Sequence, residues 1–280
     1  MLQSQSRVVT IFGLQAAGIS DVEQFLQAHH AAGMSKLCKL NEVSDFAAFI
    51  RQVREIADRN PEQETWVLAD MYCAWTMDWV REAKRLLGSS KRFEKVHIVF
   101  LSDARQTFTL VRADLDVVDK LNGEGITILQ LKPWHPSMLR RWLSDCELEN
   151  TRQVVEMITE TTGNWPSLLY RLYRNAVKNP HQLRQRIREF RQEMLRKETL
   201  DDILPEFGII REEDFQVFKV LSLGKARPDE IAGFCEMPVE AVRPVLAASE
   251  LLGTVRHVGK DVWQADDVVA QLMQEVGDSR

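Results

Sequence analysis

The sequence predicts an α/β fold in which a five-stranded parallel sheet is followed by a helical segment and a smaller helix and hairpin segment. From Arg7 to about Leu143, short apolar runs alternate with amphipathic stretches, as expected for a parallel sheet covered by helices. After the two prolines of KPWHP (132–136) the pattern becomes almost entirely helical. The chain has 280 residues, 45% of them apolar, which is enough for two or three small domains.

The predicted sheet contains five strands, each a short apolar run. They are VVTIF (8–12), KLCKL (36–40), TWVLA (65–69), VHIVFL (96–101) and ITILQL (126–131). Helical spacing of apolar residues between them predicts helices at 21–32, 44–59 and 76–87, each opened by Ser, Asp or Thr as an N-cap. We expect the first strand to lie inside the sheet, flanked by the strands at 65–69 and 96–101.

The second half of the chain is predicted to be helical and to end in a hairpin. Four helices are expected first, at 137–144, 151–161, 165–177 and 180–197. Three more, at 212–221, 228–235 and 238–249, precede the short strands TVRHV and DVWQA, which a turn at Gly259-Lys260 joins. This order is typical of a winged helix. We therefore predict three domains, at 1–136, 137–204 and 205–280.

The segment GLQAAGIS, directly after the first strand, has the spacing of a phosphate-binding loop. Gly13, Gly18 and the hydroxyl of Ser20 match the pattern, and the following helix would aim its N–H groups at an anion. Ile19 stands where such a loop has a lysine that neutralises the β- and γ-phosphates. The pattern therefore indicates weakened nucleotide binding, and a tight turn without any ligand is the alternative.

Polar residues follow two further strands of the predicted sheet. Asp70 ends WVLAD and is a candidate Mg²⁺ ligand together with Ser20, although it could instead only cap the next helix. Met71 stands where a second acid would polarise the attacking water. The residues after the strand at 96–101 are candidate γ-phosphate contacts, with an ordinary polar loop as the alternative: Ser102, Asp103 and Arg105.

Taken in order, RVVTIFGLQAAGIS, WVLAD, VHIVFLSDAR, ITILQLKPWHPSMLRRWL and TGNWPSLLYRLY resemble the AAA+ and STAND class of P-loop ATPases over about residues 7–200. The resemblance implies a five-stranded P-loop NTPase-like sheet, a helical lid at 137–204, and ATP or ADP with Mg²⁺ as cofactors. It also implies that Gly163–Pro166 forms the lid turn that contacts nucleotide, with one residue more between Gly163 and Pro166 than in the family. Arg171 and Arg174 would then face a phosphate.

The missing loop lysine and the missing second acid point to a pseudo-ATPase. The expected function is a regulatory or architectural module that binds partner proteins, with weak or no nucleotide binding and no efficient hydrolysis. Its partners would be other subunits of a homo-oligomeric or hetero-oligomeric AAA+-type assembly, with no membrane involved.

A basic region from Arg171 to Lys197 leaves a second function open. It could contact nucleic-acid phosphates, an acidic partner or the next subunit, or be an ordinary salt-bridged helix face. The alternative is therefore a nucleic-acid-associated ATPase subunit whose active site a neighbour completes. The helix at 238–249 presents mainly alanine, valine and leucine, which favours protein packing over groove reading. The candidate contacts with nucleic acid or a partner are Arg184, Arg188, Arg191, Arg256 and Lys260.

The overall composition excludes several other classes. The net charge is −5, and no apolar run approaches the roughly 18 residues of a membrane span, so we expect a cytoplasmic protein. The four cysteines lie far apart in the sequence, which supports neither zinc nor disulfides. Three tryptophans near strand ends could line a partner surface: Trp75, Trp79 and Trp134.

Overall fold

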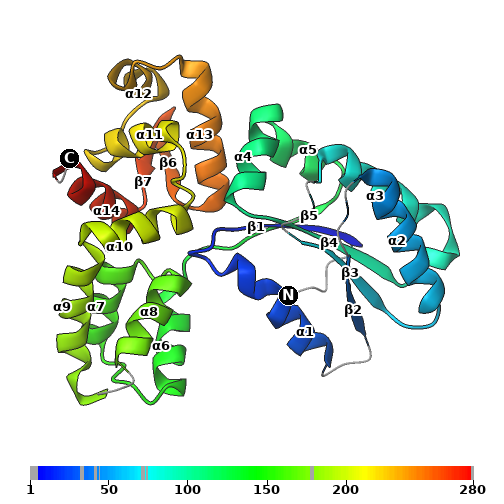
Figure 1. Cartoon of the computed structure of the whole chain (residues 1–280), viewed down its shortest axis with the longest axis horizontal. Coiled ribbons are helices and arrows are strands. Elements are labelled where there is room, and N and C mark those ends of the chain that lie inside the picture. Colours follow the sequence, from blue (N-terminus) through cyan, green and yellow to red (C-terminus); the bar gives the residue numbers. More distant parts are fainter. Residues whose placement is uncertain are drawn as a thin grey trace. The chain divides into compact units, whose positions relative to one another are not determined.

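The computed structural model describes residues 6–31, 35–40, 43, 45–70, 73, 75–176 and 180–278, which form two compact units (Figure 1). Unit 1 comprises the chain up to Gly13 together with Ile19–Gln130. Unit 2 comprises Leu14–Gly18 and Leu131–Arg280. The short segment after the first strand thus belongs to unit 2, although unit 1 precedes and follows it in the sequence. The division into three domains stays a prediction.

Unit 1 is built on a five-stranded parallel sheet with the strand order β2-β3-β4-β1-β5. Its strands are β1 (Val8–Phe12), β2 (Lys36–Lys39), β3 (Thr65–Ala69), β4 (Val96–Ser102) and β5 (Thr127–Gln130). Every residue of β1 and β3 is buried, as is usual where helices cover both faces of a parallel sheet. The predicted α/β fold with five parallel strands is confirmed.

The neighbours of β1 differ from the expectation. β1 lies inside the sheet between β4 and β5, whereas β3 pairs with β4. The expected pairing of β1 with the strand at 65–69 was therefore wrong. Strands that are buried on both faces are apolar throughout, so their sequences contain no signal that distinguishes one neighbour from another.

Helices connect the strands of unit 1. They are α1 (Val22–Ala31), α2 (Phe46–Arg59), α3 (Met77–Ser89), α4 (Ala104–Ala113) and α5 (Val117–Gly123), with 3₁₀ turns at Ile19–Asp21 and Lys91–Phe93. Asp45 caps α2, because its side chain accepts a hydrogen bond from the N–H of Ala48 at 2.8 Å. No helix was expected between residues 102 and 126, where α4 and α5 lie.

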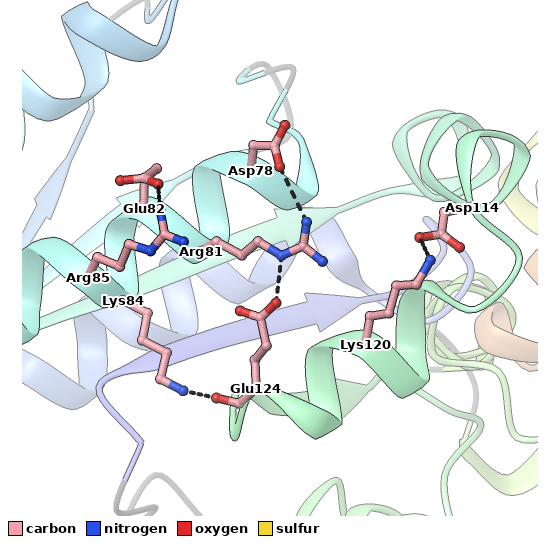
Figure 2. Close-up of polar contacts among 8 residues, drawn as sticks. All are labelled: Asp78, Arg81, Glu82, Lys84, Arg85, Asp114, Lys120 and Glu124. Atoms are coloured by element: carbon pink, nitrogen blue, oxygen red, sulfur yellow. Dashed lines mark hydrogen bonds and ion pairs between the residues drawn. The ribbon is translucent and has the colours of Figure 1, made fainter.

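A polar cluster joins α3 to the end of α5 (Figure 2). Arg81 of α3 donates from Nε to Oε1 of Glu124 at 2.5 Å and also pairs with Asp78 at 3.4 Å. The ammonium of Lys84 donates to the carbonyl of Glu124. Glu124 lies directly after α5, so these contacts hold the connection to β5 against α3. Because β5 pairs with β1, these contacts also help to position β1, the strand that precedes Leu14–Gly18.

The helices of unit 2 begin after β5. They are α6 (Pro136–Asp145), α7 (Arg152–Thr162), α8 (Pro166–Ala176), α9 (Leu183–Met194) and α10 (Lys197–Ile203), with 3₁₀ turns η3 (Pro180–Gln182) and η4 (Leu204–Phe207). The single helix expected at 180–197 was wrong. Arg196 has an extended backbone with ψ of 141°, which ends α9 before α10 begins, and a repeat of apolar residues cannot reveal one extended residue.

The last part of unit 2 contains three helices, an antiparallel hairpin and a final helix. They are α11 (Glu212–Ser222), α12 (Pro228–Cys235), α13 (Val239–Leu252), β6 (Val255–Gly259), β7 (Val262–Ala265) and α14 (Asp267–Asp278). The helix α14 was not expected from the sequence. The hairpin turns at Lys260-Asp261, one residue later than expected, and Asp261 has φ of 57°. Ala226, before α12, forms an isolated bridge to Trp263 of β7. In the described part of the chain, no helix combines the length and apolar character needed to cross a membrane.

Candidate functional site

The loop segment, defined here as Leu14–Gly18, forms hydrogen bonds within itself. The N–H of Ala17 donates to the carbonyl of Leu14, and the N–H of Gly18 donates to that of Gln15, each at 3.0 Å. These bonds form two successive tight turns, and Gly18 has φ of 82°, a conformation that favours glycine. In a phosphate-binding loop the corresponding N–H groups face an anion. Here they face carbonyl groups of the chain.

Two further backbone N–H groups of this region also donate to the chain. Within unit 1, the N–H of Gly13 donates to the carbonyl of Ser102 at 3.0 Å. Within unit 2, the N–H of Ala16 donates to the carbonyl of Glu206 at 3.0 Å, and the carbonyl of Ala16 accepts from the N–H of Ser167 at 3.1 Å. Ala16 therefore uses both of its backbone groups to join the loop segment to η4 and α8.

The residue in the place of the loop lysine is part of the core. Ile19 has an exposed fraction of 0%, as do Leu14 and Ala16, whereas Ser20 is exposed. Ile19 belongs to the 3₁₀ turn Ile19–Asp21, and α1 begins only at Val22. A side chain at position 19 thus packs among apolar groups instead of facing solvent.

Asp70, the predicted Mg²⁺ ligand, is buried and paired with a lysine. It follows β3, is 7% exposed, and lies 3.0 Å from the ammonium of Lys39 at the end of β2. Lys39 also donates to Oε2 of Glu23 on α1 at 2.8 Å. The hydrogen bond to Glu23, followed by the one to Asp70, raises the pKa of Lys39. The carboxylate that would hold a metal is therefore paired with an ammonium that Glu23 also shares.

Lys39 was not predicted as part of this site, although the sequence contains a signal for it. The carboxyl ends of neighbouring parallel strands meet at the same edge of a sheet, and β2 pairs with β3 in a register that places Lys39 opposite Leu68. A lysine that ends one strand can therefore reach an aspartate that follows the next.

The chain beyond Asp70 returns into the core. Met71 lies outside the described residues, but Cys73 and Trp75 are buried. Burial, more than the charge of Asp70, raises the pKa of the Cys73 thiol to about 11. The indole Nε1–H of Trp75 donates to the carbonyl of Leu101 at 2.7 Å, and its ring lies 5.2 Å from that of Phe100. The expectation that Trp75 lines a partner surface was wrong, because its ring fills the carboxyl end of the sheet.

The three polar residues after β4 have separate environments. Ser102 is fully buried, with its hydroxyl 2.9 Å from that of Thr107. Asp103 caps α4 by accepting a hydrogen bond from the N–H of Gln106 at 2.9 Å. Arg105 is exposed. A contact between these residues and a γ-phosphate stays a prediction.

Comparison with solved structures identifies the fold. The Walker-type ATPase PABY2304 of Pyrococcus abyssi superposes with a TM-score of 0.60 over 96% of this chain and 91% of that chain, at 12% sequence identity. The chain has the fold of a P-loop ATPase. The RuvB Holliday junction branch migration motor of Thermotoga maritima gives a TM-score of 0.47 over 94% of this chain and 86% of that chain, at 13% identity. No protein-family model and no curated protein sequence matches the chain.

The turn predicted to contact nucleotide in the lid lies at the centre of unit 2. Gly163 and Asn164 have φ of 56° and 60°, and Pro166 starts α8. A Cβ at Gly163 would lie 3.0 Å from side-chain atoms of both Trp165 and Val268 and would require a left-handed backbone, so any larger residue would be strained. Trp165 is fully buried, its ring lies 5.1 Å from that of Phe207, and its Nε1–H donates to Asp266 at 3.3 Å. Burial raises the pKa of Asp266.

Arg171 and Arg174, which were predicted to face a phosphate, have partners inside unit 2. The guanidinium of Arg171 on α8 forms an ion pair with the carboxylate of Glu206 in η4. Arg174 lies over the ring of Tyr170, with its guanidinium carbon 6.0 Å from the ring centroid. The sequence offers no signal for the pair of Arg171 with Glu206, because the two residues lie on separate elements.

The residues proposed to contact nucleic acid or a partner divide into paired and unpaired groups. Arg184 pairs with Glu149 at 2.5 Å, which lowers the pKa of that glutamate, and Arg256 lies 3.5 Å from Asp267. With the amide of Gln271 turned so that its oxygen faces Arg191, this oxygen accepts a hydrogen bond from Nη2 of Arg191 at 3.0 Å. Among the described residues, the cations without an ion pair or hydrogen bond include Arg188 and Lys260.

Two hollows on the described surface were not expected from the sequence. One, at the cluster of Figure 2, is lined by three acidic and three basic side chains, so it has no net charge that would favour an anion: Asp78, Arg81, Glu82, Lys84, Arg85 and Glu124. The other lies on α11 and α12 and includes Leu223 and Phe234, which are 81% and 79% exposed.

Proposed function

We propose that the chain is a regulatory or architectural pseudo-ATPase module of the AAA+ and STAND type, which binds partner proteins and does not consume nucleotide. In this proposal residues 137–204 form a helical lid and residues 205–280 a winged helix. The chain has the fold of a Walker-type ATPase, but it has Ile19 in place of the lysine and Met71 in place of the second acid.

The closed loop segment is the observation that carries the proposal. A phosphate can be cradled only if the N–H groups of Ala16, Ala17 and Gly18 release the carbonyls they now bond. Each such bond contributes about 1 kcal/mol, and Ile19 supplies no cation in return. ATP and Mg²⁺ are the ligands that the fold allows, but the predicted metal ligand Asp70 already forms an ion pair with Lys39, with which a metal would have to compete. The residues present therefore do not fit a tightly bound Mg²⁺ nucleotide.

Exposed apolar side chains support a role in protein contacts. Leu223 and Phe234 are both largely exposed and border the hollow on α11 and α12. The one basic residue of α13, Arg243, lies 3.6 Å from Asp261 of the hairpin turn. A helix that read a DNA groove would need such a charge for phosphates or bases, so this pairing favours protein packing.

ATP is expected to bind weakly and not to be hydrolysed. Calorimetric titration up to about 1 mM ATP, with and without Mg²⁺, should give no saturable heat, which corresponds to a binding free energy weaker than about 4 kcal/mol. Phosphate release should equal that of a buffer blank. The molar mass from light scattering should not change when ATP is added. Micromolar binding or turnover by the purified chain would contradict the proposal.

Unpaired basic residues favour a second candidate, a nucleic-acid-associated subunit. Arg188, Arg196 and Lys197 are exposed and form no ion pair with the described residues. If they contact phosphates, a labelled duplex should bind at about 50 mM salt and dissociate steeply as salt rises. We expect no such binding. Binding that Arg188→Ala with Arg196→Ala abolishes, and that a charge-matched Lys91→Ala with Arg105→Ala variant retains, would replace our proposal with this candidate.

A further inference from the structure

We propose that Glu206 is a built-in substitute for a nucleotide phosphate, which keeps the loop segment and Arg171 engaged within unit 2. Its backbone carbonyl accepts the N–H of Ala16, and its carboxylate pairs with the guanidinium of Arg171. One residue thus provides acceptors to a loop N–H and to an arginine, the two kinds of group that bind a phosphate in this fold. The inference rests on the proposed pseudo-ATPase function and names the group that keeps the site closed.

The local structure fixes Glu206 in this position. It belongs to η4, in which Leu204 and Phe207 are buried on either side of it. Phe207 packs its ring against that of Trp165, and Gly208, with φ of 78°, closes the turn by donating to the carbonyl of Pro205 at 3.0 Å. The backbone of Glu206 therefore cannot shift without disturbing the core of unit 2.

The surroundings of Glu206 have unused capacity for a polar ligand. Oε2 of Glu206 and the hydroxyl of Ser167 are both buried and, within the described part of the chain, have no hydrogen-bond partner. Ser167 is also the residue whose N–H bonds the carbonyl of Ala16. A salt bridge formed only for surface stability would leave its carboxylate in water, where both oxygens are solvated. Oε2 of Glu206 is instead buried, so this oxygen lacks the solvation of a surface carboxylate and adds a desolvation cost to the pair with Arg171.

Binding of a phosphate group would therefore compete with Glu206. Arg171 donates from Nη2 to Oε1 of Glu206, so a phosphate would compete with this carboxylate for the guanidinium and would be repelled by its charge. Removing the charge of Glu206 while keeping its shape should leave Arg171 and the hydroxyl of Ser167 available. The ligand class is a phosphate-bearing molecule such as ADP, and no metal is required.

The test is calorimetric titration with ADP in the absence of divalent metal. We expect Glu206→Gln to bind ADP at least about tenfold more tightly than the unchanged protein. The double variant Glu206→Gln with Arg171→Met should lose the gain, because the gain depends on the released arginine. Glu193→Gln, an exposed change of equal charge on α9, should leave binding unchanged. Equal affinity of Glu206→Gln and the unchanged protein would overturn the inference.

The failure of this inference differs from the failure of the proposed function. If the unchanged protein binds ADP at micromolar concentration, the proposed function fails; if neither protein binds it, only the role of Glu206 fails. A second measurement does not depend on the folding of any variant. In the unchanged protein, the N–H groups of Ala16 and Ser167 should exchange with deuterium as slowly as those in the middle of α8, and rapid exchange at both would overturn the inference.

Discussion

Replacing Trp75 with alanine is expected to lower the free energy of unfolding of unit 1 by about 3–5 kcal/mol. Trp75 is fully buried, and its ring contacts Phe12 of β1 and Phe100 of β4. The substitution removes this apolar surface from the core and leaves the carbonyl of Leu101 without its indole donor. Urea denaturation followed by far-ultraviolet circular dichroism would measure the loss.

Two controls separate the parts of this effect. Trp75→Phe keeps an aromatic ring but lacks the N–H, so it should retain more than half of the stability that alanine loses. Trp134→Ala truncates a half-buried tryptophan of unit 2 and should lower the free energy of unfolding clearly less than Trp75→Ala does. If Trp75→Ala costs no more than Trp134→Ala, the indole does not fill the carboxyl end of the sheet, and that space is open to a ligand.

The strands could be predicted because burial makes them apolar without interruption. VVTIF and TWVLA match β1 and β3 residue for residue, since both are covered on two faces and bounded by polar residues or glycine. The order of the strands could not be predicted on the same grounds. The information that places β4 between β3 and β1 lies in long-range packing, which the pattern within one strand does not contain.

The helices that were not predicted were missed for a different reason than the strand order. Asp103 followed by apolar residues at helical spacing predicts α4 as an ordinary capped helix, but Asp103 was interpreted as a candidate γ-phosphate contact or as part of a polar loop. The sequence therefore contained the signal for α4, an N-cap followed by apolar residues at helical spacing. The break between α9 and α10 had no comparable signal, because it depends on the extended backbone of Arg196 alone.

The sequence predicted which residues the candidate site lacks, but not which residues now bind the groups that remain. The absence of a lysine at position 19 is visible in the sequence. The contacts that occupy the same groups come from elsewhere: Lys39 from an edge strand, and Glu206 from a turn far along the chain. Neither residue belongs to a motif, because each is brought to these groups only by the fold. A degenerate motif therefore indicates where chemistry has been lost, and only the fold shows what now binds the groups that remain.

Restoring the loop lysine with Ile19→Lys is expected to destabilise the protein and to produce no ATPase activity. Ile19 is fully buried, so the new ammonium would lie in an apolar environment that lowers its pKa by up to about 3–5 units. Each unit corresponds to about 1.4 kcal/mol, so the free energy of unfolding at neutral pH should fall by about 4 kcal/mol or more. Hydrolysis should stay at the buffer rate, because Met71 still supplies no acid.

The pH dependence of this variant provides the decisive measurement. A lysine whose pKa is lowered by folding binds fewer protons in the folded than in the unfolded state, so stability must rise with pH between the lowered pKa and about 10.4. Ile19→Met, which has a similar volume and no charge, should lack this rise. If Ile19→Lys is instead as stable as Ile19→Met at pH 7 and binds ATP at micromolar concentration, then the loop segment opens at little cost. In that case the hydrogen bonds of Ala16, Ala17 and Gly18 do not hold it closed, and the proposed pseudo-ATPase function loses its main support.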